Sequence, residues 1–308
     1  MTESDLLSLL RTLPLHPGAR GLRDDAAVVG GLVLTTDTLV EGVHYLPADP
    51  PGDVAWKLLA VNLSDLAAKG AEPEGAMLNY PLSDAAWDRA FFEGLRAALT
   101  AFGCPLIGGD TVTLPAGAPR VLSLTALGRN AAAPSRTGAR PGDALWVTGP
   151  IGDAGAGLAV AGGAPGPPAL LAAYRRPVPR LAEGRALAPL VHAMSDVSDG
   201  LLIDTARMAE ASGLGVTVDL MRVPLSPAYI AQRGDARHAR LAATTAGDDY
   251  QLLFAAAPTF EPPVPAARIG AFASGGGLAL TEAGAPMPLP PSLGFEHRTP
   301  LAPGNRPT

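Results

Sequence analysis

Apolar residues in the first half of the chain recur in some segments at the spacing of a strand and in others at the spacing of a helix, which predicts a mixture of both. The β-branched run LVLTTDT at residues 32–38 predicts a strand that ends at Asp37. Apolar residues recur at helical spacing over 53–69, with Asp53 as the expected N-cap, and Asn62, Asp65 and Lys69 share one polar strip of that helix. Further segments predict a strand near 75–80, a helix over 84–101, a strand running into Gly108–Asp110 and a strand over 121–128.

The turn-rich segment GARPGD at 138–143 precedes a new apolar strand, ALWVTG, and places the predicted domain boundary near residue 140. We therefore expect one domain over 1–140 and a second over 141–308. Glycines and prolines divide the uncharged run 154–174 into helix, loop and helix, so it does not read as a membrane span. The second half predicts helices over 153–162, 179–191 and after Asp199, strands over 215–219, 241–246 and 250–256, and an irregular proline-rich tail from about 284. The fold class is mixed α/β.

Composition narrows the choice of partners. The chain has 308 residues, 47% of them apolar and 17% charged, with a net charge of −6, which predicts a globular protein with a large core. No run of lysines or arginines builds a basic patch, so we expect no nucleic-acid partner. A single cysteine, Cys104, excludes an intramolecular disulfide. The start MTESDLLSLL is acidic and has only a short apolar stretch, unlike a signal peptide, so we expect a cytoplasmic protein.

Aspartates are grouped beside glycine, serine or threonine in six short islands. Two carboxylates about 4 Å apart repel by roughly 4 kcal/mol at an effective dielectric near 20, so several can converge only around bound cations. The leading hypothesis is a divalent-metal site, with magnesium favoured by separated carboxylates. Nine of nineteen aspartates belong to these islands: Asp24, Asp25, Asp37, Asp65, Asp110, Asp196, Asp199, Asp248 and Asp249.

Several enzyme classes lack their motifs in this chain. No phosphate loop ending in Gly-Lys-Ser or Gly-Lys-Thr is present, and no GxGxxG joins a strand to a helix. GxSxG and HExxH are absent as well. What remains is chemistry that needs metals and glycine-bounded loops, and phosphoryl transfer fits because it needs mainly positioning and charge neutralisation. A non-catalytic metal- or nucleotide-binding protein is the rival hypothesis. Each aspartate also has a structural alternative: Asp37 as a turn cap, Asp65 as an ion-pair partner of Lys69, and Asp199 as a helix N-cap.

Five ordered motifs carry a resemblance that covers nearly the whole chain. They are TTDTLVEGVHY at 35–45, VNLSDLAAKGAEP at 61–73, IGGDT at 107–111, SDVSDGL at 195–201 and GDDYQLLF at 247–254. Together they resemble the thiamine-monophosphate kinases, within a wider superfamily that includes aminoimidazole ribonucleotide synthetase, selenophosphate synthetase and a hydrogenase-maturation protein. The segments VEGVHY and GDDYQLLF look most like the thiamine kinases.

The resemblance implies a two-domain aminoimidazole ribonucleotide synthetase-like fold whose N-terminal domains pair into a dimeric β-barrel. It implies that ATP and several Mg²⁺ ions bind between the domains, and that ATP phosphorylates thiamine monophosphate directly, without a catalytic side chain. Another ATP-dependent synthetase of the superfamily, acting on a different substrate, is the alternative. Residues matching metal positions are Asp25, Thr35, Thr36, Asp37, Asp65, Asp110, Asp196 and Asp199; nucleotide contacts are Gly109, Asp110, Arg136 and Ser198; substrate contacts are His44, Asp248 and Phe295.

Three positions depart from the family pattern. Arg23 stands where the family usually has glycine before the first Asp-Asp, and Asp248 stands where a glutamate is more common. The basic residue that usually follows the GGDT motif is missing from TVTLPAG, which leaves Arg136 or another arginine to neutralise phosphate.

Overall fold

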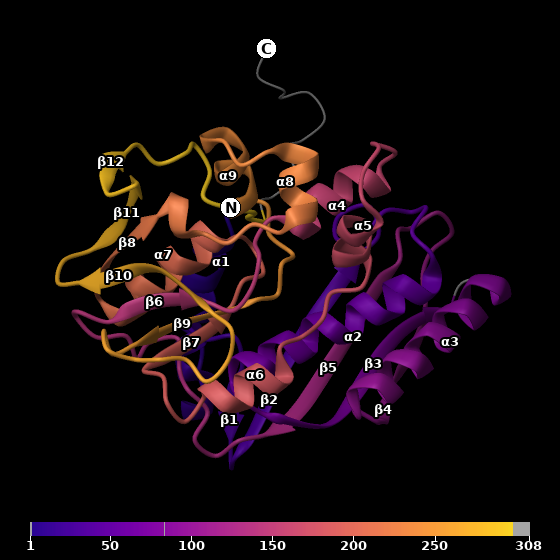
Figure 1. The fold of residues 1–308 in the computed structure, drawn as a ribbon. Coiled ribbons are helices and arrows are strands. Elements are labelled where there is room, and N and C mark those ends of the chain that lie inside the picture. Colours follow the sequence, from indigo (N-terminus) through magenta and orange to yellow (C-terminus); the bar gives the residue numbers. More distant parts are fainter. Residues whose placement is uncertain (1, 83, 298–308) are drawn as a thin grey trace.

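Two β-sheets, one from each half of the chain, organise the structure, a computed structural model that describes residues 2–82 and 84–297 (Figure 1). The first has the strand order β1-β2-β5-β3-β4, and the second has the order β12-β11-β8-β10-β6-β9-β7. Helices alternate with strands in both halves, as the apolar pattern predicts.

The first sheet is antiparallel except for its last pair, β3 with β4, which is parallel. All eight residues of β4 are exposed, and β4 is an edge strand. This edge therefore lies open in a single chain. The strands are β1 (Ala27–Val29), β2 (Leu32–Val40), β3 (Glu72–Leu82), β4 (Leu106–Thr113) and β5 (Val121–Arg129).

Helix α2 (Pro51–Ala68) runs through the middle of the molecule and positions much of the site. It packs against α3 (Ala85–Phe102) and β5 on one side and against α6 (Leu181–Leu187) and β7 (Ala193–Asp196) of the other half. Thirteen of its residues are buried, which is the pattern of a core helix. It begins at Pro51 and not at Asp53 as expected, because proline already has the backbone angle of a first helical residue.

The second sheet packs against the helix Leu201–Ser212, which contacts three of its strands (Figure 1). Its other strands are β6 (Ala144–Val147), β8 (Gly215–Asp219), β9 (Leu252–Ala256), β10 (Ala267–Ala273), β11 (Gly277–Glu282) and β12 (Ala285–Met287). The helices are α1 (Glu3–Leu10), α4 (Asp153–Ala161), α5 (Pro168–Arg175), α7 (Leu201–Ser212), α8 (Pro227–Arg233) and α9 (Arg237–Thr244), with short 3₁₀ turns at Pro17–Leu22 and Leu220–Arg222.

In this half one sequence prediction is wrong and one differs in its bounds. Residues 241–246 do not form a strand: α9 covers most of them, because Ala239 and Ala243, four residues apart, are buried on one helix face. The predicted helix over 179–191 is shorter and ends at Leu187. The uncharged run 154–174 forms helix, loop and helix, as predicted.

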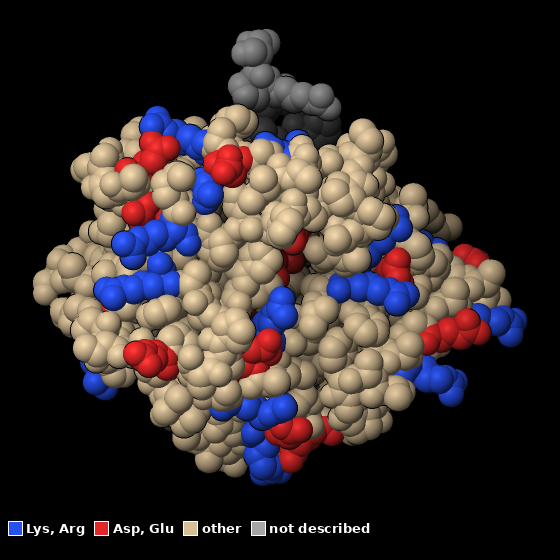
Figure 2. Space-filling view, in the orientation of Figure 1, with Lys and Arg blue, Asp and Glu red and all other residues tan. Residues whose placement is uncertain are grey.

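The first and last described segments of the chain lie against each other beside the site. The backbone N–H of Glu3 donates to the carbonyl oxygen of His297 over 3.3 Å, so α1 lies against the tail. Up to residue 297 the tail is irregular as predicted, except for β12, and its remaining residues lie outside the described range. On the face drawn in Figure 2, charged side chains lie in small mixed groups without an extended basic patch. Within the described ranges, no helix has both the length and the apolar character needed to cross a membrane.

Candidate active site

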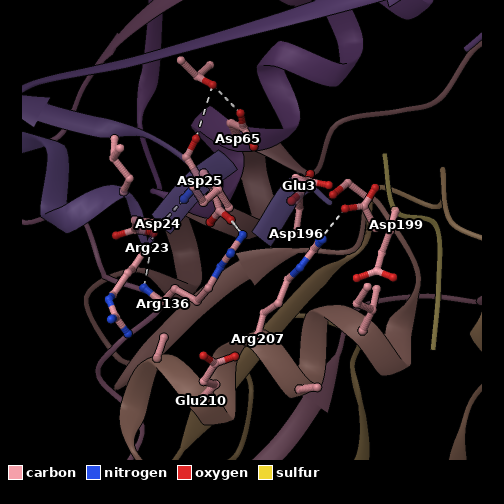
Figure 3. A pocket seen from close by; sticks show the side chains of 18 of the residues that line it. Glu3, Arg23, Asp24, Asp25, Asp65, Arg136, Asp196, Asp199, Arg207 and Glu210 are labelled. Carbon is pink, nitrogen blue, oxygen red and sulfur yellow. Dashed lines mark hydrogen bonds and ion pairs between the residues drawn. The ribbon is translucent and has the colours of Figure 1, made fainter. Parts of the chain in front are cut away.

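Three aspartates from distant parts of the sequence converge at one point between the halves (Figure 3). Asp25 precedes β1, Asp65 lies in the last turn of α2, and Asp196 ends β7. One carboxylate oxygen from each lies within 4.8 Å of the others. A group of carboxylate oxygens at this spacing suits a hard divalent cation such as Mg²⁺.

Hydroxyl groups hold two of these carboxylates in place. Ser64 Oγ, on α2, donates to Asp196 Oδ2 over 2.5 Å and so connects α2 to β7. The hydroxyl of Thr35, on β2, donates to Asp65. The site is therefore built on two strands and a helix, which keeps the carboxylates fixed when no cation is present.

Asp37 and Asp199 extend the cluster into a continuous acidic wall. Asp37 lies on β2, and its backbone N–H donates to Oδ1 of the buried Asn62 over 3.1 Å. Asp199 lies in the loop between β7 and α7. Both carboxylates line two neighbouring cavities, which share this wall.

The wall carries more negative charge than the surrounding protein neutralises. Burial, reinforced by the charges of Asp37, Asp196 and Asp25, raises the pKa of Asp65 well above its usual value. Burial and the nearby Asp25 do the same for the pKa of Asp196. Burial, followed by the charges of Asp199 and Asp25, raises the pKa of Asp37 to about 6. A bound cation would reverse each of these effects, which supports the metal hypothesis.

A buried lysine stands behind the wall. Lys69 Nζ lies 2.5 Å from Asp24 Oδ1, 2.6 Å from Asp25 Oδ2 and 3.0 Å from the carbonyl oxygen of Met194. The alternative interpretation of Asp65 as the partner of Lys69 is therefore wrong, because Lys69 turns toward residues 24 and 25. Burial opposes ionisation of Asp24, but Lys69 and Arg20 outweigh it and lower its pKa to about 2. Asp24 is thus a structural anchor.

Arginines surround the first cavity, which has a volume of about 520 Å³. Arg136 is paired with Asp25, and Arg207 with Asp199. Arg23 also lines the cavity and has no carboxylate partner among the residues that the structure describes. Ser198 lies on the shared wall. Guanidinium groups beside a metal-suited wall can take phosphate oxygens.

The second cavity, of about 640 Å³, contains the three predicted substrate contacts. His44 accepts the backbone N–H of Val40 at Nδ1 over 3.0 Å, and burial, with the charge of His297 next, lowers its pKa. The ring of Phe295 is 45% exposed and packs edge-on against His297. Aromatic rings and a carboxylate, Asp248, therefore face one space.

Asp248 is held tightly by its neighbours. Its Oδ2 accepts from the buried Lys57 Nζ over 2.7 Å, and its Oδ1 accepts from the Tyr250 hydroxyl over 2.9 Å. The backbone at Asp248 and Tyr250 has positive φ, 63° and 50°, which is strained for residues with side chains. These contacts hold the loop in a backbone conformation that residues with side chains seldom adopt.

The structure does not bring every predicted residue to the wall. Thr36 lines both cavities, but its hydroxyl donates to the carbonyl oxygen of Leu124 over 3.2 Å. Gly109 and Asp110 lie on β4, which is separated from β2 by two strands, and they line neither cavity. Within one chain they are therefore apart from the other predicted metal and nucleotide residues. Asp199 does not cap α7, whose N-cap is Gly200 without a side-chain bond.

Two further carboxylates shape the loops of the site: the sequence pattern does not point to the buried Asp204, and it assigns no role to Asp249. Asp204 Oδ2 accepts the backbone N–H groups of Ser198, Asp199 and Gly200 over 3.0, 3.0 and 3.2 Å. Asp249 accepts the N–H of Gly152, at the start of α4, over 2.8 and 2.9 Å. An aspartate in the first turn of the helix after SDG was the available signal for Asp204; none pointed to the contact of Asp249 with α4.

Comparisons with known proteins agree with this geometry. The family models for AIR synthase related protein match residues 23–130 for the N-terminal domain and 140–283 for the C-terminal domain. A thiamine-monophosphate kinase of Caulobacter vibrioides is 41% identical over 96% of this chain and 91% of its own length. The chain belongs to the thiamine-monophosphate kinase family. The Escherichia coli K12 member of the thiamine-monophosphate kinase family is 39% identical over 76% of this chain and 75% of its own length.

Solved structures of the thiamine-monophosphate kinase family share the fold. AaThiL complexed with AMPPCP and TMP matches with a TM-score of 0.85 at 28% identity, covering 96% of this chain and 97% of that one. The thiamine-monophosphate kinase of Stenotrophomonas maltophilia K279a matches with a TM-score of 0.74 at 36% identity, covering 91% and 96%. The predicted family and the two-domain mixed α/β fold are thereby confirmed.

Proposed function

We propose that this protein transfers the γ-phosphoryl group of ATP to thiamine monophosphate, giving thiamine diphosphate and ADP. The observation that carries the proposal is the acidic wall shared by two cavities. Phosphoryl transfer needs a donor and an acceptor on either side of a charge-neutralising centre. Support comes from the family to which the chain belongs and from a relative solved with AMPPCP and TMP.

The cavity with the arginines is the proposed nucleotide side. Arg23, Arg136 and Ser198 line it and offer guanidinium and hydroxyl donors to phosphate oxygens. Leu7 and Ile203 add apolar surface for the base. Because Arg23 has no carboxylate partner among the described residues, it is our candidate to replace the basic residue missing after the GGDT motif.

The cavity with His44, Asp248 and Phe295 is the proposed substrate side. A thiazolium ring is a flat cation, so an aromatic ring and a carboxylate offer complementary surface and charge. Burial lowers the pKa of the half-buried His44, which favours the neutral imidazole. Because its Nδ1 accepts from the Val40 N–H, its Nε2–H is the atom that can donate a hydrogen bond to the substrate. These assignments predict that the phosphate of the substrate points toward the acidic wall.

Magnesium fits the donor set between the cavities. Asp25, Asp65 and Asp196 would hold it, since they converge through carboxylate oxygens and two of them have raised pKa values. When bound, Mg²⁺ neutralises the repulsion between the two phosphate groups. The chain itself needs no strong general base, because the second pKa of a phosphate monoester is about 6 and the acceptor oxygen is already largely ionised.

Pairing of two chains through β4 is the proposed role of the open sheet edge. Leu106, Ile107 and Val112 on this strand are exposed apolar side chains, and an exposed apolar edge is a typical site of strand pairing or burial. A homodimer with a shared barrel would also give Asp110 and Gly109 a route to a metal and nucleotide site, that of the partner chain. Chain mass by light scattering, with Ile107→Lys as the disrupting variant, tests this pairing.

We further propose that residues 1–140 and 141–308 act as the two domains, and that the protein works in the cytoplasm, where ATP and Mg²⁺ are available. The direct test of function is formation of thiamine diphosphate from thiamine monophosphate, ATP and Mg²⁺. We expect Asp196→Asn to remove most of this activity, while Asp235→Asn, at an exposed aspartate, keeps it. Folded wild-type protein that forms no thiamine diphosphate would overturn the proposal.

A further inference from the structure

Arg136 forms an ion pair with a carboxylate that we propose as a metal ligand. Its guanidinium donates to Asp25, and no other carboxylate in residues 2–82 and 84–297 forms an ion pair with it. The same Asp25 contributes an oxygen to the converging group with Asp65 and Asp196. Arg136 is also predicted to contact the nucleotide. It cannot serve both roles in the orientation seen here.

The surroundings of Arg136 allow its guanidinium to change partner. Its backbone is fixed, because its N–H donates to Asp24 Oδ1 over 3.3 Å and its carbonyl oxygen accepts from Ser212 Oγ over 3.4 Å. Its side chain lines the first cavity, and its Nε is buried without a hydrogen-bond partner (Figure 3). A buried donor without a partner is unfavourable, so an anion in this cavity would gain by meeting it.

The other cations of the wall lack this freedom. Lys69 bridges Asp24 and Asp25 and would keep Asp24 if a metal took Asp25. Arg207 contacts Asp204 over 3.1 Å in addition to Asp199. Of these three cations, only Arg136 would have no carboxylate partner left after a metal binds Asp25. Its guanidinium would then be available to a phosphate group.

We propose that Arg136 occupies the cation position on Asp25 until the metal binds, and that the displaced guanidinium then contacts the phosphates of the nucleotide. The inference rests on the proposed nucleotide and metal sites. Arg136 therefore lowers metal affinity in the nucleotide-free protein and raises nucleotide affinity in the metal-loaded protein. By linkage, metal and nucleotide favour each other's binding through this side chain, in addition to any direct contact between them.

The proposal predicts that Arg136→Gln raises the affinity for metal and lowers the affinity for nucleotide. A purely structural role of Arg136 would not change the two affinities in opposite directions. Calorimetric titration of the nucleotide-free variant with Mg²⁺ should show binding about 10-fold tighter than wild type, because the competitor on Asp25 is gone. Titration of the Mg²⁺-loaded variant with a nonhydrolysable ATP analogue should show binding about 10-fold weaker. Arg237→Gln, which breaks an exposed pair with Glu282, is the matched control and should change neither. Weaker binding of both ligands to Arg136→Gln would overturn the proposal.

A second variant changes Asp25, the partner of Arg136, and so tests whether the released guanidinium binds nucleotide. Asp25→Asn removes the carboxylate that holds Arg136, so the ATP analogue should bind several-fold more tightly than to wild type in the presence of EDTA. Loss of the negative charge of Asp25 could by itself tighten binding of the ATP analogue. In the double variant Asp25→Asn/Arg136→Gln that charge is also lost but the guanidinium is absent, so the gain in affinity should disappear if Arg136 causes it. A gain that persists in the double variant, or no gain in Asp25→Asn, would contradict the exchange. Both experiments measure binding and not catalysis. A protein that binds these ligands as described but makes no thiamine diphosphate would therefore refute the proposed kinase activity without refuting the exchange of Arg136.

Discussion

Asp37 offers a quantitative test of the idea that the wall is built for cations. Its pKa is raised from 3.8 to about 6 by burial and by the charges of Asp199 and Asp25. The folded state therefore binds the proton more tightly than the unfolded state. In metal-free protein, the contribution of Asp37 to stability is complete below pH 4 and is lost as the pH rises through 6.

The size of the effect follows from the same values. One pH unit corresponds to roughly 1.4 kcal/mol, so ionised Asp37 destabilises the folded state by about 3 kcal/mol at pH 8. Because Asp37 is partly exposed to the cavities, solvent screening reduces our expectation to about 1–3 kcal/mol. Asp37→Asn removes this penalty and leaves the backbone bond to Asn62 intact.

Urea unfolding in EDTA at pH 4 and pH 8 measures the difference. We expect Asp37→Asn to exceed wild type in free energy of unfolding by about 1–3 kcal/mol at pH 8 and to match it at pH 4. Added Mg²⁺ should stabilise wild type more than the variant. Asp235→Asn, at an exposed position, should behave as wild type throughout. If the variant is no more stable than wild type at pH 8 without metal, ionised Asp37 does not destabilise the folded state.

Three further predictions concern buried polar groups. Asp249→Ala should lower the free energy of unfolding in urea by about 1–3 kcal/mol, because the Gly152 N–H loses its acceptor, while Asp249→Asn keeps most of the stability. Lys57→Met leaves Asp248 without its cation and should raise the KM for thiamine monophosphate several-fold with the KM for ATP unchanged; an equal rise in both would contradict a substrate-side role. An amine-reactive reagent followed by mass spectrometry should label neither Lys57 nor Lys69 in native protein and both after denaturation, since each is at most 2% exposed.

The sequence predicts most elements of the fold because their patterns are strong. Strand β2, helix α2 and the turn-rich segment near residue 140 follow from β-branched runs, helical spacing and glycine–proline punctuation. The strand expected over 241–246 includes the β-branched Thr244 and Thr245, whereas buried alanines at helical spacing place most of this segment in α9. Strands β10 and β11 carry glycines and no clear alternation, so their pairing is set by tertiary contacts.

In the site, too, some features follow from the sequence and others only from the fold. Asp25, Asp65 and Asp196 were predicted from motifs, and the structure brings them together. Their partners were not predictable, because a lysine four residues after Asp65 suggested a local ion pair and only the fold directs Lys69 toward Asp24. Long-range contacts of this kind depend on how α2 packs between two sheets.

The chain uses lysine in an unusual way. Its sequence has two lysines and 21 arginines, and both lysines lie on α2, buried, each against a carboxylate of the site. A compact ammonium group fits such a position where a planar guanidinium needs more space. Lys57 pairs with a carboxylate of the proposed substrate side and Lys69 with carboxylates of the proposed metal side, so one helix contributes charge to both.

A crystal structure with Mg²⁺, a nonhydrolysable ATP analogue and thiamine monophosphate would test whether the acidic wall separates a nucleotide side from a substrate side. We expect cations on Asp25, Asp65 and Asp196, the triphosphate in the cavity with Arg136, and the thiamine rings in the cavity with His44, with the two phosphate groups meeting at the shared wall. Cations bound away from these three carboxylates, or both ligands on one side of the wall, would contradict this arrangement.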